Sequence, residues 1–458
     1  MRLFRHETLD TRMTIFWFRR DLRLHDNAGL YHALKSKQPV LPLFIFDQHI
    51  LDDLRDRSDA RVTFIHNTLQ QLKQELEALG SSLMVRFGKP EDIWPQLLKD
   101  YPVKAVYTNR DYEPYAKVRD EQVAQMLQAK GIAFHTFKDH VIFEADEVLK
   151  DDGKPYTVFT PYSRKWLARL DTRHKTVVEA DGSKARRSYY LSPYPTEKYF
   201  AHFQSSDPLP FPSLESMNFT PSAIQMPSAV VKQGLIRSYD KTRDKPGILG
   251  TSRLGIHFRF GTISIREKAR HAQQLNATYL NELIWRDFYS QILSHFPQVA
   301  DGPFKPIYGN IEWRDAPDDF RRWCEGRTGY PIVDAGMREL NSTGFMHNRV
   351  RMIVASFLSK HLLINWQQGE AYFAEKLLDF DLASNSGGWQ WAAGCGTDAA
   401  PYFRIFNPTE QTKKFDPEYQ YIRRWVPEFG TALYPKPMVE HSFARQRCLD
   451  TFKKALQP

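Results

Sequence analysis

The first third of the chain alternates between two periodicities, and this alternation restricts the fold more than any other feature of the sequence. Amphipathic stretches at helical spacing, such as Val62–Leu79 and Lys117–Gln128, separate short apolar runs that are typical of buried strands. The runs are Thr14–Phe18, Val40–Phe46, Leu83–Phe87, Val103–Thr108 and Ala133–Phe137. Strands that alternate with helices form a parallel sheet covered on both faces. We therefore expect an α/β doubly wound domain over residues 13–140.

The turn after the first of these strands argues against a dinucleotide site. It reads Phe18-Arg19-Arg20-Asp21-Leu22-Arg23 and contains no glycine that would let a pyrophosphate approach the backbone. Residues 1–12 precede the first strand and have no apolar core of the kind found in signal peptides. We expect them to be a loose extension.

The alternation stops near residue 140. Prolines and serines crowd residues 192–228, so we expect residues 141–228 to form a long interdomain linker. Residues 229–458 show helical periodicity and contain seven of the ten tryptophans. We expect a second, all-α domain there with its own chemistry.

Composition narrows the class of protein. The 458 residues carry a formal net charge of +9, which favours a polyanionic partner such as DNA or RNA. The three cysteines (Cys324, Cys395 and Cys448) show no disulfide or metal spacing, which suits a reducing cytoplasm and indicates no metal site. No apolar run reaches the length of a membrane span.

Two predicted helices place chemically useful side chains on one face. In residues 281–289, Glu282, Trp285 and Arg286 stand at i, i+3 and i+4. Such a face can accept an N–H from a base, stack on its ring and hold a phosphate. The alternative is a structural helix with a buried tryptophan and a glutamate paired to a neighbouring arginine.

The second helix contains Met346-His347-Asn348-Arg349-Val350-Arg351-Met352. Asn348, Arg351 and Met352 share a face, and Arg349 should turn aside. No second ligand stands at metal spacing from His347, so we interpret this histidine as structural.

Two further segments are unusual in composition. Residues 378–391 hold two acids, an asparagine, a Gly-Gly pair and two tryptophans, which predicts neither a good helix nor a good strand. They form either a ligand-contacting segment or a packed turn. The stretch Gly250-Thr251-Ser252-Arg253-Leu254-Gly255 offers hydroxyls and backbone N–H groups for a phosphate, but it is not a Walker loop.

These segments, in this order, resemble the photolyase/cryptochrome family over residues 13–458. The opening Phe16-Trp17-Phe18-Arg19-Arg20-Asp21-Leu22-Arg23-Leu24-His25-Asp26-Asn27 is similar to the family's amino-terminal motif. The carboxy-terminal similarity runs from Thr328 through Pro408. The resemblance implies an α/β antenna domain, a linker and a helical domain that binds FAD.

The resemblance also implies roles for individual residues around FAD. Residues that match flavin-contacting positions are Tyr239, Thr251, Ser252, Arg253, Leu254, Gly255, Glu282, Arg286, Asn348, Arg351, Asp379, Asp381 and Asn385. Gly255 departs from the family, which often has serine there. Asn385 matches the position that faces flavin N5, where a neutral amide can hydrogen-bond in different redox states.

In the family's reaction, excited reduced FAD passes an electron to a pyrimidine dimer that has left the DNA duplex, and the electron returns after the cyclobutane bonds break. By resemblance, Glu282 hydrogen-bonds the flipped bases and the other catalytic residues are Asn348, Met352, Trp285 and Trp391. Arg243 and Arg349 match positions near the DNA backbone, and Trp285 and Asn348 are also expected to bind DNA. Trp389, Trp366 and Trp313 match the tryptophans that re-reduce the flavin under light.

Within the family, the Met-His-Asn-Arg segment resembles enzymes for cyclobutane dimers and lacks the His-His pair of (6-4) photolyases. The alternatives are a (6-4) photolyase and a cryptochrome-type light sensor. The last segment, Phe443–Leu456, predicts an amphipathic helix, with no disordered tail for signalling. We expect a monomeric cytoplasmic enzyme, associated with the nucleoid, that acts on UV-damaged DNA without an obligate protein partner.

An antenna chromophore is a further expectation. The segment Asn109-Arg110-Asp111-Tyr112-Glu113 resembles one in which bacterial relatives bind a folate, with Glu113 as its acidic contact. Methenyltetrahydrofolate and a deazaflavin are the candidates. The alternative is a Glu113 that is simply solvated near Arg119.

Overall fold

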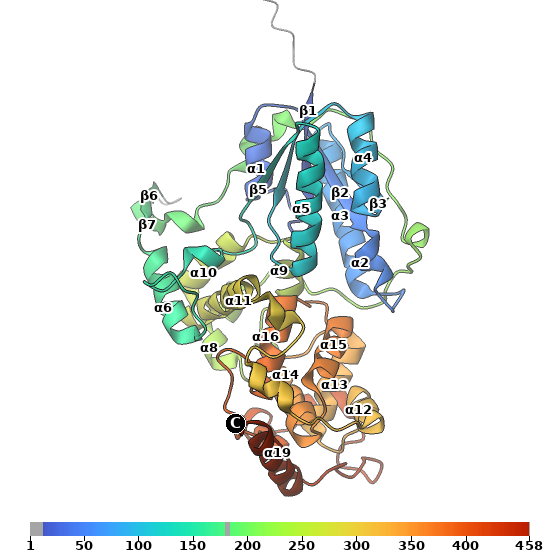
Figure 1. Cartoon of the computed structure of the whole chain (residues 1–458), viewed down its shortest axis with the longest axis vertical. Coiled ribbons are helices and arrows are strands. Elements are labelled where there is room, and N and C mark those ends of the chain that lie inside the picture. Colours follow the sequence, from blue (N-terminus) through green and yellow to red (C-terminus); the bar gives the residue numbers. More distant parts are fainter. Residues whose placement is uncertain (1–11, 179–183, 458) are drawn as a thin grey trace, which may run out of the picture. The chain divides into compact units, whose positions relative to one another are not determined.

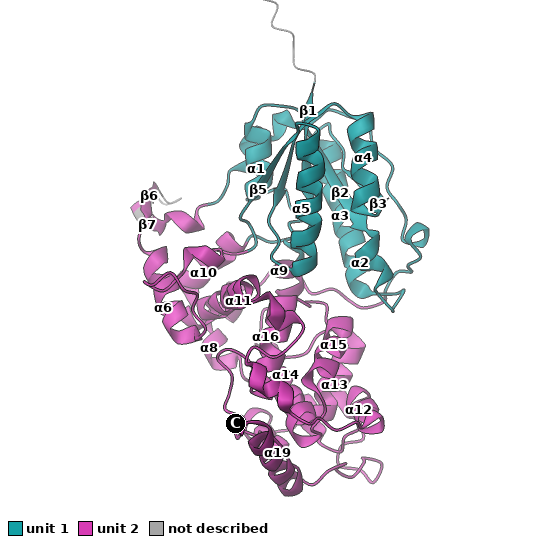
Figure 2. Ribbon diagram, viewed as in Figure 1, with its two compact units in different colours: residues 1–140, 193–222, 260–264 teal, residues 141–192, 223–259, 265–458 magenta. Residues whose placement is uncertain are grey.

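The computed structural model describes residues 12–178 and 184–457, and the chain divides into two compact units (Figures 1 and 2). The first unit comprises residues up to 140 together with residues 193–222 and 260–264. The second comprises residues 141–192, 223–259 and 265–458. Except for Arg12, the predicted amino-terminal extension lies outside the described residues.

The first unit is built on a parallel five-stranded sheet, which confirms the predicted α/β class. The strand order is β3-β2-β1-β4-β5. Its strands are β1 (Met13–Phe18), β2 (Val40–Asp47), β3 (Met84–Gly88), β4 (Val103–Asn109) and β5 (Ala133–Phe137). Its helices are α1 (Ala28–Lys35), α2 (Gln48–Asp52), α3 (Ala60–Ala78), α4 (Pro90–Asp100) and α5 (Pro114–Ala129).

The order of the strands determines which helices cover each face of the sheet. Right-handed crossovers put α1 and α3 on one face and α4 and α5 on the other, because the strand order reverses after β3. Helices α4 and α5 pack side by side (Figure 1). Strand β2 is buried along its whole length, as a central parallel strand should be.

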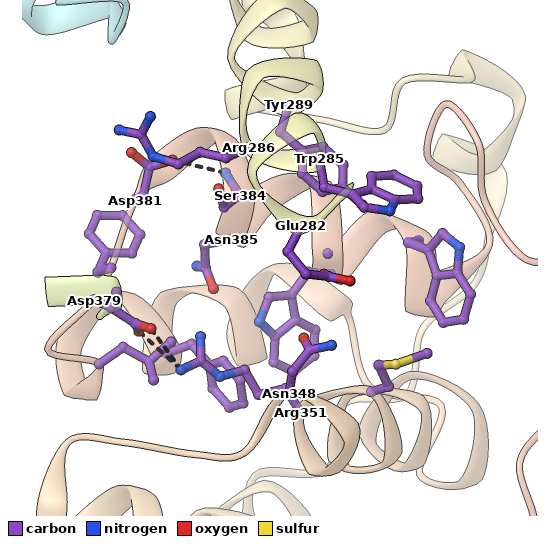
Figure 3. A pocket seen from close by; sticks show the side chains of 18 of the residues that line it. Glu282, Trp285, Arg286, Tyr289, Asn348, Arg351, Asp379, Asp381, Ser384 and Asn385 are labelled. Atoms are coloured by element: carbon purple, nitrogen blue, oxygen red, sulfur yellow. Dashed lines mark hydrogen bonds and ion pairs between the residues drawn. The ribbon is translucent and has the colours of Figure 1, made fainter. Parts of the chain in front are cut away.

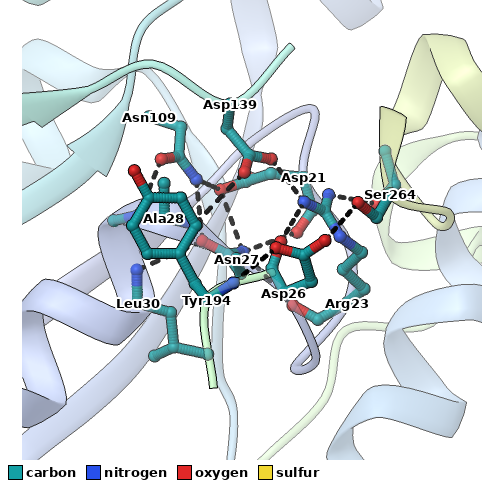
Figure 4. A network of polar contacts seen from close by, with 12 residues as sticks. Asp21, Arg23, Asp26, Asn27, Ala28, Leu30, Asn109, Asp139, Tyr194 and Ser264 are labelled. Atoms are coloured by element: carbon teal, nitrogen blue, oxygen red, sulfur yellow. Dashed lines mark hydrogen bonds and ion pairs between the residues drawn. The ribbon is translucent and has the colours of Figure 1, made fainter. Parts of the chain in front are cut away.

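The crevice between β1 and β4, where doubly wound folds bind nucleotides, is filled by the protein's own polar groups (Figure 4). Asn109 Nδ2 donates to Asp21 Oδ2 at 2.5 Å and to Asn27 Oδ1 at 2.8 Å. Asn27 Oδ1 also caps α1 by accepting from Leu30 N. Burial is the main cause that raises the pKa of Asp21. Because these side chains occupy the crevice, the turn after β1 needs no glycine to let a pyrophosphate approach the backbone.

The same network anchors two segments that arrive from later in the sequence. The Asp26 carboxylate accepts from Tyr194 N at 2.8 Å and from Ser264 Oγ at 2.5 Å. Gly261 has φ +63°, and a Cβ there would lie 2.2 Å from the Arg20 carbonyl oxygen. Only glycine fits that close approach without strain.

The second unit is mainly helical, as predicted for residues 229–458. Its α-helices are α6 (Phe159–Leu170), α7 (Gln233–Arg237), α8 (Tyr239–Thr242), α9 (Gly255–Phe260), α10 (Ile265–Leu275), α11 (Ala277–His295), α12 (Pro317–Cys324), α13 (Pro331–Thr343), α14 (Asn348–Ser356), α15 (Trp366–Lys376), α16 (Leu382–Ala393), α17 (Pro408–Phe415), α18 (Gln420–Trp425) and α19 (His441–Ala455). Helix α19 confirms the amphipathic helix expected near the carboxyl end, with Ala444, Cys448 and Phe452 buried.

Short elements complete the fold. A five-residue π-helix, η7 (Phe357–His361), follows α14 directly. The 3-10 turns are η1 (Ala145–Glu147), η2 (Tyr189–Leu191), η3 (Thr196–His202), η4 (Glu215–Met217), η5 (Pro297–Ala300) and η6 (Pro306–Asn310). Antiparallel strands β6 (His174–Val178) and β7 (Lys184–Ser188) form a hairpin.

The segment expected to be one linker differs from that expectation, because its two parts belong to different units. Residues 141–192 include α6, whose Tyr162 and Trp166 are fully buried in a core of the helical unit. Residues 193–222 pack in the α/β unit, where η3 contacts α1. Proline- and serine-rich composition signalled irregular backbone, but it did not indicate against which unit each part would be buried.

Within the described ranges, no helix is long and apolar enough to span a membrane. The same ranges contain no group of three or more histidine, cysteine or acidic side chains that could hold a metal ion. The three cysteines are free thiols.

Candidate active site

A cavity of about 450 Å³ lies within the helical unit (Figure 3). Its walls come from α9, α11, α14, α15 and α16 and from the segment before α16. The volume is within the usual range for small-molecule and cofactor sites. Most of the residues that the sequence marked for cofactor or substrate contact line it.

Helix α11 contributes the face predicted from spacing. Its apolar residues, including Leu283 and Phe288, are buried in the core, and Glu282, Trp285 and Arg286 line the cavity together. The structural alternative also has support, because Trp285 stacks on Phe159 with ring centroids 3.6 Å apart. The ligand-contacting and the structural interpretation are compatible, because the stacking on Phe159 holds the Trp285 indole in place as part of the cavity wall.

The carboxylate of Glu282 is engaged by an arginine from before α9. Arg243 donates to Glu282 Oε1 at 2.5 Å, and both side chains are about one-quarter exposed. Burial raises the pKa of Glu282, and the Arg243 guanidinium opposes part of that rise. The site therefore holds a partly desolvated carboxyl whose charged form the Arg243 guanidinium stabilises.

Helix α14 brings Asn348, Arg351 and Met352 to the cavity, as their spacing predicted. The expectation that Arg349 turns aside was wrong, because Arg349 also lines the cavity and pairs with Asp244 at 2.7 Å. A long arginine side chain reaches around the helix, so helical spacing alone does not fix where its guanidinium lies.

His347 has a structural position. It is the N-cap of α14, and its Nδ1 accepts from the backbone N–H of Arg349 at 3.1 Å. Burial lowers its pKa to about 4, so the ring is neutral near pH 7. A neutral imidazole can accept this capping bond, and an imidazolium cannot.

The acidic segment before α16 closes another side of the cavity. Asp379 accepts two hydrogen bonds from Arg351 Nη2, at 3.0 and 3.1 Å. Asp381 caps α16 through Ser384 N and lies 3.6 Å from Arg259. Arginine side chains from α14 and α9 thus hold both carboxylates in place.

The prediction that residues 378–391 form neither a good helix nor a good strand was wrong for residues 382–391, which belong to α16. The Asp381 cap begins the helix, and Gly394 in the left-handed region ends it. Gly387 is required by packing, because a Cβ there would lie 2.2 Å from the Tyr289 ring of α11. The glycines therefore permit close helix packing as well as an open cavity wall.

Asn385 lies on α16 and points into the cavity (Figure 3). Its Nδ2 donates to the backbone oxygen of Glu370 at 3.1 Å and to Glu370 Oε1 at 2.7 Å. Glu370, on α15, is a residue that sequence reasoning missed.

The residues predicted to contact the flavin phosphates are Tyr239 and residues 251–255, which lead into α9. Tyr279 OH donates to Ser252 Oγ at 3.0 Å, and the Tyr279 ring packs edge-on against Tyr239 at 5.0 Å. Leu254 is buried, and Arg253 lies 3.7 Å from Glu339. Of the residues predicted here, Gly255 lines the cavity, and the others do not: Tyr239, Thr251, Ser252, Arg253 and Leu254.

Gly255 also has a packing reason for departing from the family's serine. A Cβ at this position would lie 2.4 Å from Asp379 Oδ2. Any side chain would therefore displace the carboxylate that Arg351 holds.

The tryptophans are distributed through the core of the helical unit. Trp389 and Trp391 line the cavity, and Trp366 begins α15 with 4% of its surface exposed. Trp313 packs against Phe452 at 6.0 Å. The sequence did not indicate Trp323, a buried residue of α12 whose ring lies 6.1 Å from Trp389.

Glu113 lies in the α/β unit, at the N-cap of α5. It accepts from Arg20 at 3.1 Å, and Arg20 also donates to Asp111 at 3.0 Å. The alternative of a solvated Glu113 near Arg119 does not describe this arrangement, because Arg119 contacts Asp47 and Asp120 instead. The folate contact stays a prediction.

Two family models match the sequence. Residues 14–180 match DNA photolyase, and residues 279–432 match the FAD binding domain of DNA photolyase. A deoxyribodipyrimidine photo-lyase from Synechococcus sp. is 38% identical over 94% of this chain and 95% of the relative. The chain belongs to the DNA photolyase family. The deoxyribodipyrimidine photo-lyase of Escherichia coli is also 38% identical, over 96% of this chain and 98% of the relative.

Solved structures show that the family fold extends over the whole chain. A class III photolyase from Agrobacterium tumefaciens superposes with a TM-score of 0.83 at 31% identity, covering 98% of this chain and 99% of that one. A Synechocystis cryptochrome gives a TM-score of 0.79 at 24% identity, covering 96% and 99%, which shows the fold alone. The FAD-binding domain of the photolyase family includes α11, α14, α15 and α16, which build most of the cavity.

Proposed function

We propose that this protein repairs cyclobutane pyrimidine dimers in DNA with light energy, through FAD bound in the cavity of the helical unit. One observation carries the proposal. The residues expected to contact the dimer and most of those expected to contact the flavin line one and the same cavity. Relatives over nearly the full length of the chain are named deoxyribodipyrimidine photo-lyase.

The cavity fits a flavin in its chemistry. Gly255 and Asp379 both line the cavity, and the lack of a side chain at Gly255 lets a flat ring system approach the backbone there. Arg351, Asp379 and Asp381 supply fixed charges, and Asn385 supplies an amide. These residues would hold the isoalloxazine and ribose.

The bound FAD, when reduced and excited by light, would supply the electron that splits the dimer. The Glu282 carboxylate accepts an N–H from a flipped pyrimidine, and its partial burial strengthens that bond. Asn348 and Met352 contact the dimer, while Trp285 and Trp391 form the walls that exclude water.

Two arginines suit contact with the DNA backbone. Arg243 and Arg349 line the cavity, and each is paired with one carboxylate, Glu282 and Asp244 respectively. Approaching phosphates would compete for these guanidinium groups, which bind phosphate in a bidentate manner. The net charge of +9 favours the same encounter.

UV-damaged DNA is the proposed partner, and the protein would act on it as a monomer. A DNA substrate would place the protein with the nucleoid in the cytoplasm of a bacterium.

The test uses purified, chemically reduced protein and a DNA duplex with one defined cyclobutane thymine dimer. Near-ultraviolet to blue light should restore thymine absorbance, and the sample kept in the dark should not change. A duplex with a (6-4) lesion serves as the matched substrate.

Recovery with the cyclobutane duplex alone supports the proposal. Recovery with the (6-4) duplex alone would instead identify a (6-4) photolyase. No recovery with either duplex, from protein whose FAD content is shown by absorbance, would contradict repair and favour a light sensor.

A further inference from the structure

Residues 160–190 carry a large share of the positive charge of the protein. They hold eight arginines and lysines against three acids, which is more than half of the formal net charge of +9. In the structure, the described part of this segment consists largely of α6 and the two strands of the β6–β7 hairpin (Figure 1). A surface with so many like charges repels itself and favours a polyanionic partner.

The cations of this segment face solvent. Helix α6 buries Tyr162, Trp166 and Leu170 in the core, whereas Arg164 and Lys165 are exposed. The exposed cations in and beside the hairpin are Arg173, Lys175, Lys184 and Arg186. The helix and the hairpin thus form one basic surface of the helical unit.

Few carboxylates neutralise this basic surface. Lys165 pairs with Asp151 at 2.7 Å. Within residues 160–178 and 184–190, the exposed cations that form no ion pair with a described carboxylate are Arg164, Arg173, Lys175, Lys184 and Arg186. Most of the exposed charge is therefore available to an external anion.

The register of the hairpin adds to the repulsion. Lys175 lies directly opposite Arg187 on the neighbouring strand. Like charges in this position destabilise a strand pair. An anion bound beside these two side chains would relieve the repulsion, so the hairpin is better suited to a ligand-bound state than to a free one.

Helix α6 connects the basic surface to the cavity. Its first residue, Phe159, stacks on Trp285 of the cavity wall with ring centroids 3.6 Å apart. At its other end, the carbonyl oxygen of Leu170 accepts from Ser188 Oγ of β7 at 2.7 Å. A helix of 12 residues is about 18 Å long. Since nucleotides of one strand rise about 3.4 Å each, the hairpin begins about five nucleotides away from the cavity wall.

We propose that the β6–β7 hairpin and the exposed side of α6 bind the phosphate backbone of the DNA duplex that flanks the lesion. The proposal rests on the proposed function, which places the dimer in the cavity. Lysines and arginines on this surface would neutralise phosphates without reading bases, so the contact adds affinity in any sequence context.

The experiment measures binding of the holoenzyme to two substrates that each contain one thymine dimer. One is a duplex of about 30 base pairs, and the other is a single strand of about six nucleotides, whose phosphates end before the hairpin. Affinity is measured at several salt concentrations. The variant is Lys175→Gln with Lys184→Gln, and the matched control is Lys99→Gln with Lys130→Gln, which removes two exposed lysines from the α/β unit.

The hairpin variant should lose affinity only for the long duplex. Its Kd should rise about three- to tenfold, and the log–log salt slope should become shallower by about two units, one for each lysine. For the short strand, the Kd should stay within about twofold of wild type. The control variant should match the wild-type protein with both substrates. Dimer repair at saturating DNA should be unchanged in both variants, because neither alters the cavity.

An unchanged salt slope for the long duplex would overturn the proposal. So would an equal loss of affinity for both substrates, since the substitutions would then act on the cavity or the fold. An equal loss in the control would also overturn it, because net charge and not a local contact would be responsible. Wild-type protein that binds the long duplex without repairing the dimer would contradict the proposed function, and the salt slopes would still decide the role of the hairpin.

Discussion

Each unit of this protein contains a cluster of polar side chains, and the two clusters are built in opposite ways. In the α/β unit, Asp21, Asn27 and Asn109 satisfy one another and fill the crevice between β1 and β4 (Figure 4). In the helical unit, Glu282, Asn348 and Asn385 surround an open cavity (Figure 3).

The difference shows how to separate a structural motif from a site. The amino-terminal motif is the part of the sequence most easily recognised, yet its polar groups are occupied by one another and by the chain segments that they anchor. In the cavity, partners hold only one end of several groups, as Glu370 does for Asn385. A closed network stabilises the fold, and a half-satisfied one can bind a ligand.

The largest effect is expected from a substitution that breaks the closed network of the α/β unit. Asn27→Ala removes the cap of α1, so Leu30 N loses its acceptor and Asn109 Nδ2 loses one of its two acceptors. We expect the free energy of unfolding to fall by about 3 kcal/mol. Denaturant unfolding measures it, and a loss below about 0.5 kcal/mol would contradict the structural role.

The next effect concerns electron supply to the cavity. Trp389→Phe should lower the rate of flavin photoreduction at least about tenfold and spare repair by protein whose FAD has been reduced chemically. Absorbance during illumination gives the first quantity, and the dimer assay gives the second. Equal losses in both would argue against a role in re-reduction. Trp323→Phe tests whether the indole that lies against Trp389 contributes.

A smaller effect follows from the Arg243–Glu282 pair. Arg243→Gln removes the neighbour that lowers the pKa of Glu282, so this pKa should rise further above its ordinary value. The carboxylate then becomes protonated at a higher pH, and the acid limb of repair should move to higher pH. Repair is measured against pH at saturating DNA. If the acid limb of repair does not move in Arg243→Gln, a group other than Glu282 controls the pH dependence of repair.

The smallest effect is the response of DNA binding to salt. The log–log slope of affinity against salt should be about −0.9 for each phosphate neutralised in duplex DNA. Arg349→Gln should make the slope shallower by about one such unit, and Asn27→Ala should leave it unchanged. Binding titrations at several salt concentrations give the slopes, and a flat response in the wild-type protein would exclude the proposed backbone contacts.

The fold was largely predictable from local periodicity. The predictions that failed concern segments whose positions depend on long-range packing. All five strands of the parallel sheet were expected within one or two residues, because each is a short apolar run. Residues 141–192 were expected to be a linker, since nothing local indicates that Trp166 is buried in the helical unit or that Asp287 Oδ2 accepts from Ile142 N.

The site shows the same division. The faces of α11 and α14 that line the cavity were predicted from i, i+3 and i+4 spacing, because this spacing depends on the local sequence alone. Helix α16 was missed because its glycines look unfavourable until Tyr289 is seen against Gly387. Glu370 and Trp323 carry no local signal, since each acquires its position through a partner on another helix.

The cavity of the helical unit acts on the reaction, and the polar network of the α/β unit acts on stability. The most direct test measures dimer repair per bound, chemically reduced FAD, together with the free energy of unfolding, in Glu282→Ala and Asn27→Ala. We expect Glu282→Ala to lose repair about tenfold with nearly unchanged stability and FAD content, and Asn27→Ala to lose stability with unchanged repair per FAD. Loss of FAD in Glu282→Ala, or an equal loss of repair per FAD in both variants, would contradict the account.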